Sequence, residues 1–265
     1  MNDQKEALEK FLKTHDYQQA VSVLRGLLIE HCFEALGGDW EKIHYEYGLY
    51  TINCRVKSTT RVLQKYDKLS NDKDHPVEVN VKNFYALMPD LVGGRLVVLD
   101  PGDLFRLASI VKNYFASPTF LDPNSCFQKL RLRHGKFSNY DPDEFKKDGY
   151  DIDVEKSGYS SVHFVYKLSP DFFKKFCGVS DRACVERLDE LGDIPIDEWH
   201  IEIQVRTIMD EAWGEVDHFI RYEDPALLED EDVTTHCKSL AGYLQAANNH
   251  VQIIRELVRR KKYGN

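Results

Sequence analysis

The stretch WHIEIQVR at residues 199–206 alternates apolar and polar side chains with a period of two. In an extended strand one face carries the four apolar side chains, and the other carries His200, Glu202, Gln204 and Arg206. A polar strand face is not expected in a sheet that helices cover on both sides. Two interpretations follow: an edge strand with one face in water, or a carboxylate, that of Glu202, held in a cleft.

Short extended runs of this kind recur between residues 49 and 222, with helical stretches between some of them. The expected strands are Tyr50–Val56, Arg95–Leu99, Phe127–Arg133, Ser161–Leu168 and Trp199–Val205. This alternation predicts an α/β domain.

Helical spacing dominates both ends of the chain. A helical segment is predicted from about Lys5 to Leu36, where Gly37-Gly38 stops it. Beyond Pro225 one apolar stripe predicts a long helix that ends in the basic run 259–262, and this helix must pack on the core or on a partner subunit. We therefore expect three parts: an N-terminal helical segment at residues 1–48, a central domain at 49–225 and a C-terminal long helix at 226–265.

Composition narrows the class of protein. A chain of 265 residues with 42% hydrophobic content predicts one principal domain, and the formal charge of −9 argues against a protein that coats nucleic acid. The N-terminus lacks an apolar core and no later stretch is apolar enough to cross a bilayer, so we expect a cytoplasmic protein without a membrane partner. Six scattered cysteines show no metal-binding spacing, which indicates reduced packing residues.

A second carboxylate stands at Asp90, in the sequence DLVGGR that ends at Arg95. Paired glycines allow a backbone or a ligand to approach closely, and an aspartate beside an arginine suits a site for both a cation and phosphate oxygens. Taken alone, the same residues also fit a loop with a salt bridge.

Basic residues gather at Arg55, Lys57, Arg61 and Lys65. The last three recur every four residues, which predicts three positive charges on one face of a helix. Because like charges at this spacing repel, an anion is expected to bind there, and the alternative is an ordinary solvated basic face.

The segment from Lys156 to His163 joins a loop to a strand and places Tyr159, Ser161 and His163 on one side. The tyrosine ring could stack on a nucleobase and the histidine could donate to phosphate, whereas a buried tyrosine and a satisfied histidine would give the same pattern. In the helix expected from Thr207 to Tyr222, the favoured interpretation of Trp213 is core packing.

Together these motifs resemble the synthetase domain of the RelA/SpoT family over residues 49–222. In chain order they are Arg55-x-Lys57 with Lys65, Asp90-x-x-Gly93-x-Arg95, Gly158-Tyr159-x-Ser161-x-His163, and Glu202-x-Gln204-x-Arg206-Thr207 with Trp213 and His218. The resemblance is to stand-alone small alarmone synthetases. It implies an α/β (α+β) fold, a nucleotidyltransferase-like mixed β-sheet flanked by helices, with N- and C-terminal helical extensions.

The resemblance also implies a reaction, in which a GTP pyrophosphokinase transfers the β,γ-diphosphate of ATP to the 3′-hydroxyl of GDP or GTP. The products are (p)ppGpp and AMP, and the cofactor is Mg²⁺. Asp90 and Glu202 would hold the metal, and Glu202 would also accept the proton of the attacking hydroxyl. The implied ATP-binding residues are Arg55, Lys57, Arg61, Lys65 and Arg95. The implied acceptor-binding residues are Lys156, Tyr159, Ser161, His163, Gln204 and Arg206, with Tyr159 stacked on the base and His163 on the phosphates.

Departures from the family pattern at Lys156, Ser160 and Arg61 leave the acceptor open. One alternative is a toxic small alarmone synthetase that uses an adenine nucleotide or the 3′ end of tRNA and is paired with an antitoxin. Another is a nucleotide sensor without catalysis, which the presence of both carboxylates disfavours. The amphipathic terminal helices also permit a homo-oligomer.

Overall fold

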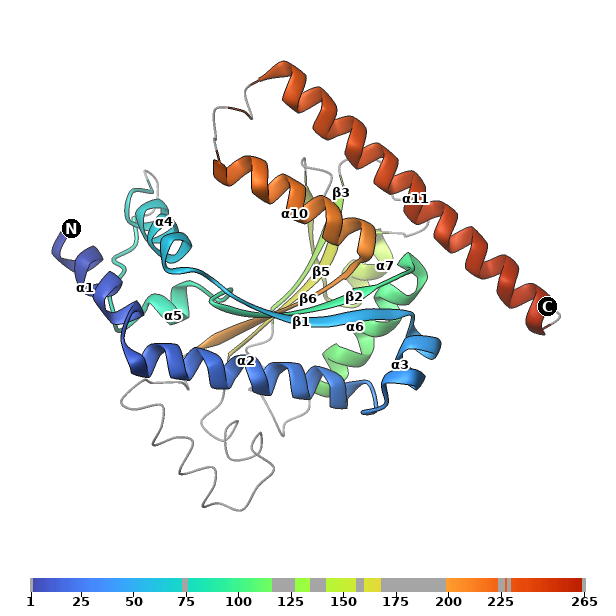
Figure 1. The fold of residues 1–265 in the computed structure, drawn as a ribbon, viewed down its shortest axis with the longest axis horizontal. Helices are drawn as coiled ribbons and strands as arrows, with labels where there is room; N and C mark the ends of the chain where they lie inside the picture. Colours follow the sequence, from blue (N-terminus) through green and yellow to red (C-terminus); the bar gives the residue numbers. More distant parts are fainter. Residues whose placement is uncertain are drawn as a thin grey trace, which may run out of the picture.

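A mixed six-stranded sheet forms the centre of the protein (Figure 1). The computed structural model describes residues 2–72, 76–115, 127–133, 142–155, 160–167, 199–223, 227 and 230–263. The strands are β1 (Leu49–Val56), β2 (Val92–Val98), β3 (Phe127–Arg133), β4 (Asp151–Glu155), β5 (Ser161–Lys167) and β6 (His200–Thr207). They lie in the order β1-β2-β6-β5-β3-β4, with β2 parallel to β6, β3 parallel to β4, and the other pairs antiparallel. The expected fold class, a mixed sheet flanked by helices, is confirmed.

The strand β6, which contains the alternating stretch, lies inside the sheet. It pairs in parallel with β2 on one side and antiparallel with β5 on the other. The interpretation of this stretch as an edge strand is therefore wrong, and its polar face has to be satisfied by protein groups or by a ligand.

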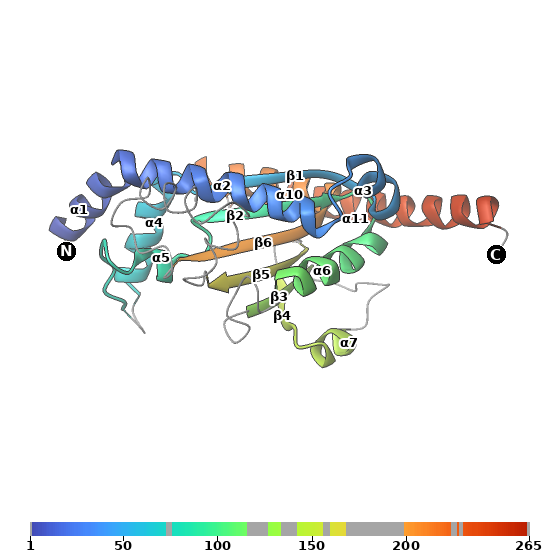
Figure 2. The same ribbon diagram turned by 90° about the horizontal axis from the view of Figure 1, so that it is seen from below.

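Helices cover both faces of the sheet (Figures 1 and 2). The helices α2 (His15–Ala35) and α6 (Pro101–Phe115) pack on one face, while α10 (Ile208–Glu223) lies over β2 and β6 on the other. The remaining helices are α1 (Asn2–Leu12), α3 (Trp40–Tyr47), α4 (Thr59–Ser70), α5 (Phe84–Leu87), α7 (Pro142–Lys147) and α11 (Glu231–Tyr263). The core lies between α2, α6 and the apolar face of the sheet, where Val205 and Ile203 are fully buried.

The N-terminal helical segment consists of two helices, because the chain turns between Leu12 and His15. Thr14 caps α2 by accepting a hydrogen bond from the backbone N–H of Tyr17. The helix ends at Ala35, and Gly37 and Gly38 then adopt positive φ angles of 99° and 70°. These glycines therefore stop the helix in the way the sequence predicts.

The long helix expected after Pro225 is α11, which packs on α10 and α6 and extends beyond the body of the protein (Figure 1). Its first turn is acidic, with Glu231 and Asp232, and the Asp230 carboxylate accepts a hydrogen bond from the N–H of Val233. Negative charge at this end of the helix is favourable because it faces the positive end of the helix dipole. Within the described ranges, every helix is too short or too polar to span a bilayer.

Gly48 ends α3 with a φ of 61°, and its position is tightly enclosed. A Cβ atom there would lie 2.6 Å from side-chain atoms of both Arg255 and Asp103.

We expect Gly48→Ala to lower the free energy of unfolding by more than the roughly 1–2 kcal/mol that a left-handed conformation costs an alanine. Urea denaturation measures the loss. Gly38→Ala is the matched control, because its φ of 70° is similar and its nearest contact is 3.9 Å; equal losses would contradict the steric argument.

Candidate active site

The paired glycines of β2 allow close packing on both faces of the sheet. Gly93 lies opposite Arg55 of β1 and Glu202 of β6, and a Cβ on it would lie 3.3 Å from the carbonyl oxygen of Glu202. A Cβ on Gly94 would lie 3.3 Å from the side chain of Leu28 on α2. The close approach expected at these glycines is therefore made by the protein itself, and Gly93 belongs to the polar face opposite α2.

A chain of hydrogen bonds runs along that polar face and holds Glu202. One of its carboxylate oxygens lies 2.7 Å from Nδ1 of His163, and the other accepts a hydrogen bond of 2.6 Å from the Gln204 amide. Gln204 in turn accepts a hydrogen bond of 2.6 Å from Arg206, while the other ring nitrogen of His163 contacts the hydroxyl of Ser161. Four acceptor-site residues implied by the resemblance thus lie in one network around the carboxylate.

The Glu202 side chain is 15% exposed, and its surroundings decide its charge. Burial raises the pKa of the carboxyl, but the charge and hydrogen bond of His163 and the hydrogen bond of Gln204 outweigh it, so the pKa is lowered. Glu202 is therefore ionised at neutral pH. A positioned, ionised carboxylate can bind a cation or accept a proton.

Asp90 lies in the turn before β2, between two lysines. One of its oxygens accepts a hydrogen bond of 2.7 Å from Lys65, and the other accepts one from Lys57. Burial raises the pKa of Asp90, but the two lysines outweigh it and lower this pKa to about 2. The anion that offsets the lysine charges is thus a side chain of the protein.

The predicted basic helix face is only partly correct. Lys57 precedes α4, because Ser58 is the N-cap and the N–H of Lys57 donates to the carbonyl of Leu91. Arg61 points to α10, where its guanidinium donates to Nδ1 of His218 at 2.8 Å. Burial and the neighbouring arginines lower the pKa of His218 to about 4, so the ring is neutral at pH 7 and can accept this hydrogen bond.

Two acidic residues of α10 bind the arginines of the polar face. Arg95 forms ion pairs with Glu211 at 3.0 Å and with Glu215 at 2.7 Å, and Arg206 pairs with Glu211 at 2.9 Å. Neither glutamate is among the site residues predicted from the sequence. Their spacing of four residues, on a helix that directly follows the polar strand, is the signal that could have identified them.

Both carboxylates line one small cavity of about 40 Å³. Its lining consists of Arg55, Asp90, Gly93, Gly94, Arg95, Glu202 and Gln204. The negative charge of Asp90 acts on Glu202 in the direction that raises the pKa of Glu202, as expected for neighbouring carboxylates. Two acidic groups from distant parts of the chain therefore meet at one place.

The carboxylate oxygens of Asp90 and Glu202 are of the ligand type that a magnesium ion prefers. Among the described residues there is no group of three or more histidine, cysteine, aspartate or glutamate side chains that could hold a metal. Mg²⁺ is commonly bound by one or two carboxylates, with water and substrate phosphates as its other ligands. Asp90 and Glu202 both offer ionised carboxylate oxygens of this kind, which here contact Lys57 and Lys65 on Asp90 and His163 and Gln204 on Glu202.

The structure does not describe every predicted residue. Lys156 and Tyr159 lie outside the described residues. Trp213 is 2% exposed, which agrees with the favoured interpretation of packing.

The mixed sheet, the helices on its two faces and the terminal helices define the fold of the small alarmone synthetases. Two proteins with solved structures show the likeness. The small alarmone synthetase 1 from Bacillus subtilis is 18% identical, with 95% of this chain and 97% of that chain covered and a TM-score of 0.53. The same protein bound to its product pppGpp gives a TM-score of 0.51, and bound to AMPCPP it gives 0.52.

A GTP pyrophosphokinase family protein from Streptococcus pneumoniae is 16% identical, with 96% of this chain and 95% of that chain covered and a TM-score of 0.54. No protein-family model matches the sequence, and no curated protein matches it at a significant level. The family resemblance inferred from the motifs is confirmed at the level of the fold.

The lowered pKa of Asp90 predicts how stability depends on pH. A carboxylate with a depressed pKa stabilises the folded state above its ordinary value of 3.8, and this contribution is lost as the pH falls through about 2. We expect the unfolding free energy to fall by about 2 kcal/mol more in the wild type than in Asp90→Asn between pH 5 and pH 2. Urea denaturation at a series of pH values tests this; parallel curves for the two proteins would contradict it.

Proposed function

We propose that the protein is a Mg²⁺-dependent pyrophosphokinase that transfers the β,γ-diphosphate of ATP to the 3′-hydroxyl of GDP or GTP, releasing AMP. The observation that carries this proposal is the meeting of Asp90 and Glu202 in one cavity that Arg55 and Arg95 also line. Phosphoryl transfer requires alignment and charge neutralisation, and these four side chains are the groups that supply them.

In this proposal Asp90 and Glu202 would hold a Mg²⁺ ion, which would neutralise charge on the transferred phosphates. Glu202 also accepts the proton of the acceptor hydroxyl. Its carboxylate is ionised at neutral pH and is held in one orientation by His163 and Gln204, so it is ready for this step.

Lys57 and Lys65 bind the ATP phosphates in the proposal, together with Arg55. Both lysines contact Asp90, the proposed metal ligand. Phosphate groups that bind next to Asp90 therefore also lie next to the ammonium groups of the two lysines. The Lys57 side chain is 8% exposed, and a charge with so little access to water interacts strongly with an anion. Arg61 and Arg95 both contact α10, Arg61 at His218 and Arg95 at Glu211, and Arg95 also lines the cavity.

For His163 we propose a positioning role in place of direct contact with the acceptor phosphates. Its ring nitrogens engage Ser161 and Glu202, and the residue is only 4% exposed. A ring held from both sides fixes the Glu202 carboxylate, much as a third group orients the base in other catalytic sets.

Two further points support the nucleotide substrates. The B. subtilis relative of the same fold has been solved with pppGpp and with AMPCPP. The formal charge of −9 weighs against tRNA as the acceptor, because tRNA binding draws on a broad basic surface. Guanine nucleotides are therefore the proposed acceptors.

An acceptor panel tests the reaction. Purified protein with Mg²⁺ and ATP is incubated with GDP, GTP, ADP or deacylated tRNA, and AMP release is measured by chromatography. We expect AMP with GDP or GTP, because the site combines a base with phosphate-binding cations. AMP only with ADP or tRNA would identify the toxin-like alternative, and no AMP with any acceptor would favour a nucleotide sensor.

A substitution tests the role of Glu202. We expect Glu202→Gln to lower turnover by about 10²–10⁴-fold, because the amide keeps the shape of the side chain and loses the base. ATP affinity, measured by equilibrium dialysis, should change little. Glu78→Gln is the control, since this exposed glutamate pairs with Gln4, away from the sheet face. Equal turnover in wild type and Glu202→Gln would remove Glu202 from the proposed role.

A further inference from the structure

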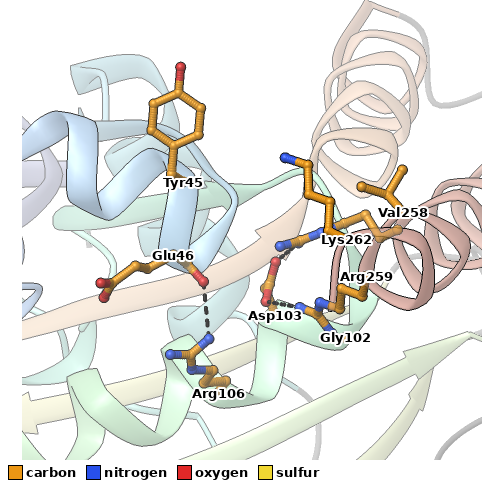
Figure 3. A pocket seen from close by; sticks show the side chains of 9 residues that line it. Tyr45, Glu46, Gly102, Asp103, Arg106, Val258, Arg259 and Lys262 are labelled. Atoms are coloured by element: carbon orange, nitrogen blue, oxygen red, sulfur yellow. Dashed lines mark hydrogen bonds and ion pairs between the residues drawn. The ribbon is translucent and has the colours of Figure 1, made fainter. Parts of the chain in front are cut away.

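A second, larger cavity of about 580 Å³ opens between α3, the beginning of α6 and the end of α11 (Figure 3). Its lining consists of Tyr45, Glu46, Gly102, Asp103, Arg106, Arg255, Val258, Arg259 and Lys262. None of these residues lines the cavity of Asp90 and Glu202. The volume lies within the range of about 300–1,000 Å³ that is usual for small-molecule sites.

The lining of this cavity carries four cationic and two acidic side chains. Arg255 is committed to structure, because it pairs with Asp100 and Asp103, which are 2% and 1% exposed. Arg259 lies 3.6 Å from Asp103 and is 54% exposed, so it retains donors and freedom to turn toward an anion. In Figure 3 the carboxylate of Glu46 points away from the side chains of α11.

Arg106 and Lys262 complete the basic lining from two elements (Figure 3). Arg106 extends from α6, where one of its five N–H donors binds the carbonyl of Glu46 at 3.0 Å and its guanidinium lies 4.7 Å from the ring centre of Tyr47. These contacts hold the guanidinium in place. Lys262 enters from the last turn of α11.

The N–H of Gly102, in the first turn of α6, already donates to the carboxylate of Asp100 at 2.6 Å, so the cationic side chains are the phosphate-binding groups of this cavity. Tyr45 is 80% exposed, and an aromatic ring beside cationic side chains offers a stacking surface for a nucleobase. A nucleoside polyphosphate combines both chemistries.

From these observations we propose that this cavity is a second binding site, separate from the proposed catalytic site, for a small phosphorylated molecule of the nucleoside polyphosphate class. Arg106, Arg259 and Lys262 bind the phosphates, and Tyr45 contacts the base.

A fluorescent reporter tests the proposal. Tyr45→Trp is introduced together with Trp40→Phe, which removes the neighbouring exposed tryptophan, and Trp40→Phe alone provides the background. ATP and inorganic tripolyphosphate are the two probes. We expect ATP to give a saturable fluorescence change in the reporter protein and none in the Trp40→Phe protein. We also expect tripolyphosphate to displace the bound ATP. The absence of either result would overturn the proposal.

The end of α11 offers a matched pair of charge variants. Arg259 and Lys262 line the cavity, whereas Arg260 and Lys261 are exposed on the same turn and do not. In the reporter protein we expect Arg259→Ala with Lys262→Ala to weaken ATP binding by about tenfold or more, through loss of charge-assisted hydrogen bonds. Arg260→Ala with Lys261→Ala removes the same charge and should leave binding within about twofold. Equal weakening by both pairs would overturn the proposal, because it would indicate a diffuse charge effect.

Glu202→Gln separates this site from the proposed catalysis. ATP binding to the reporter should persist in that variant, so a loss of AMP release and a loss of the second site are observed independently. Circular dichroism confirms that each variant retains its helices.

Discussion

The structure around the sheet depends on one partly buried interaction, the carboxylate of Asp90 held between the ammonium groups of Lys57 and Lys65. Burial alone lowers the pKa of Lys57 and raises that of Asp90, so each charge is unfavourable without its partners. The three residues come from the end of β1, from α4 and from the turn before β2. Their mutual neutralisation fixes these segments against one another and sets the position of one of the two acidic groups.

The second constraint is the polar face of β6, an interior strand of a sheet covered by helices on both faces. Glu202 is hydrogen-bonded to His163 and Gln204, and Gln204 accepts a hydrogen bond from Arg206. Arg206 in turn forms an ion pair with Glu211 on α10. A hydrogen-bonded polar network restrains the side chains that form it, and the proposed phosphoryl transfer requires such restraint of the groups in the site. The hydrogen bonds that satisfy the polar side chains of β6 inside the protein therefore also hold the Glu202 carboxylate in place.

The sequence predicted the fold class, five of the strand regions and the two carboxylates, because strand periodicity and charged residues in apolar surroundings are visible along the chain. It did not predict β4, whose acidic residues alternate with apolar ones in a segment of only five residues. It also assigned Lys57 to the helix, since periodicity alone cannot show that Ser58 begins it. The partners of Arg95 and Arg61 lie on α10. The spacing of Glu211 and Glu215 marks one acidic face of that helix, but which arginines this face meets depends on packing that local patterns do not encode.

Although the chain has a formal charge of −9, its described part contains clusters of cationic side chains around Asp90 and at the end of α11. In both places an aspartate neutralises part of the positive charge, the partly buried Asp90 in one and the buried Asp103 in the other. Each aspartate attracts the cationic side chains around it, and this lowers their mutual repulsion when no ligand is bound. A net negative charge disfavours long polyanions, and this agrees with our proposals that small phosphorylated molecules are the ligands of these two cation clusters.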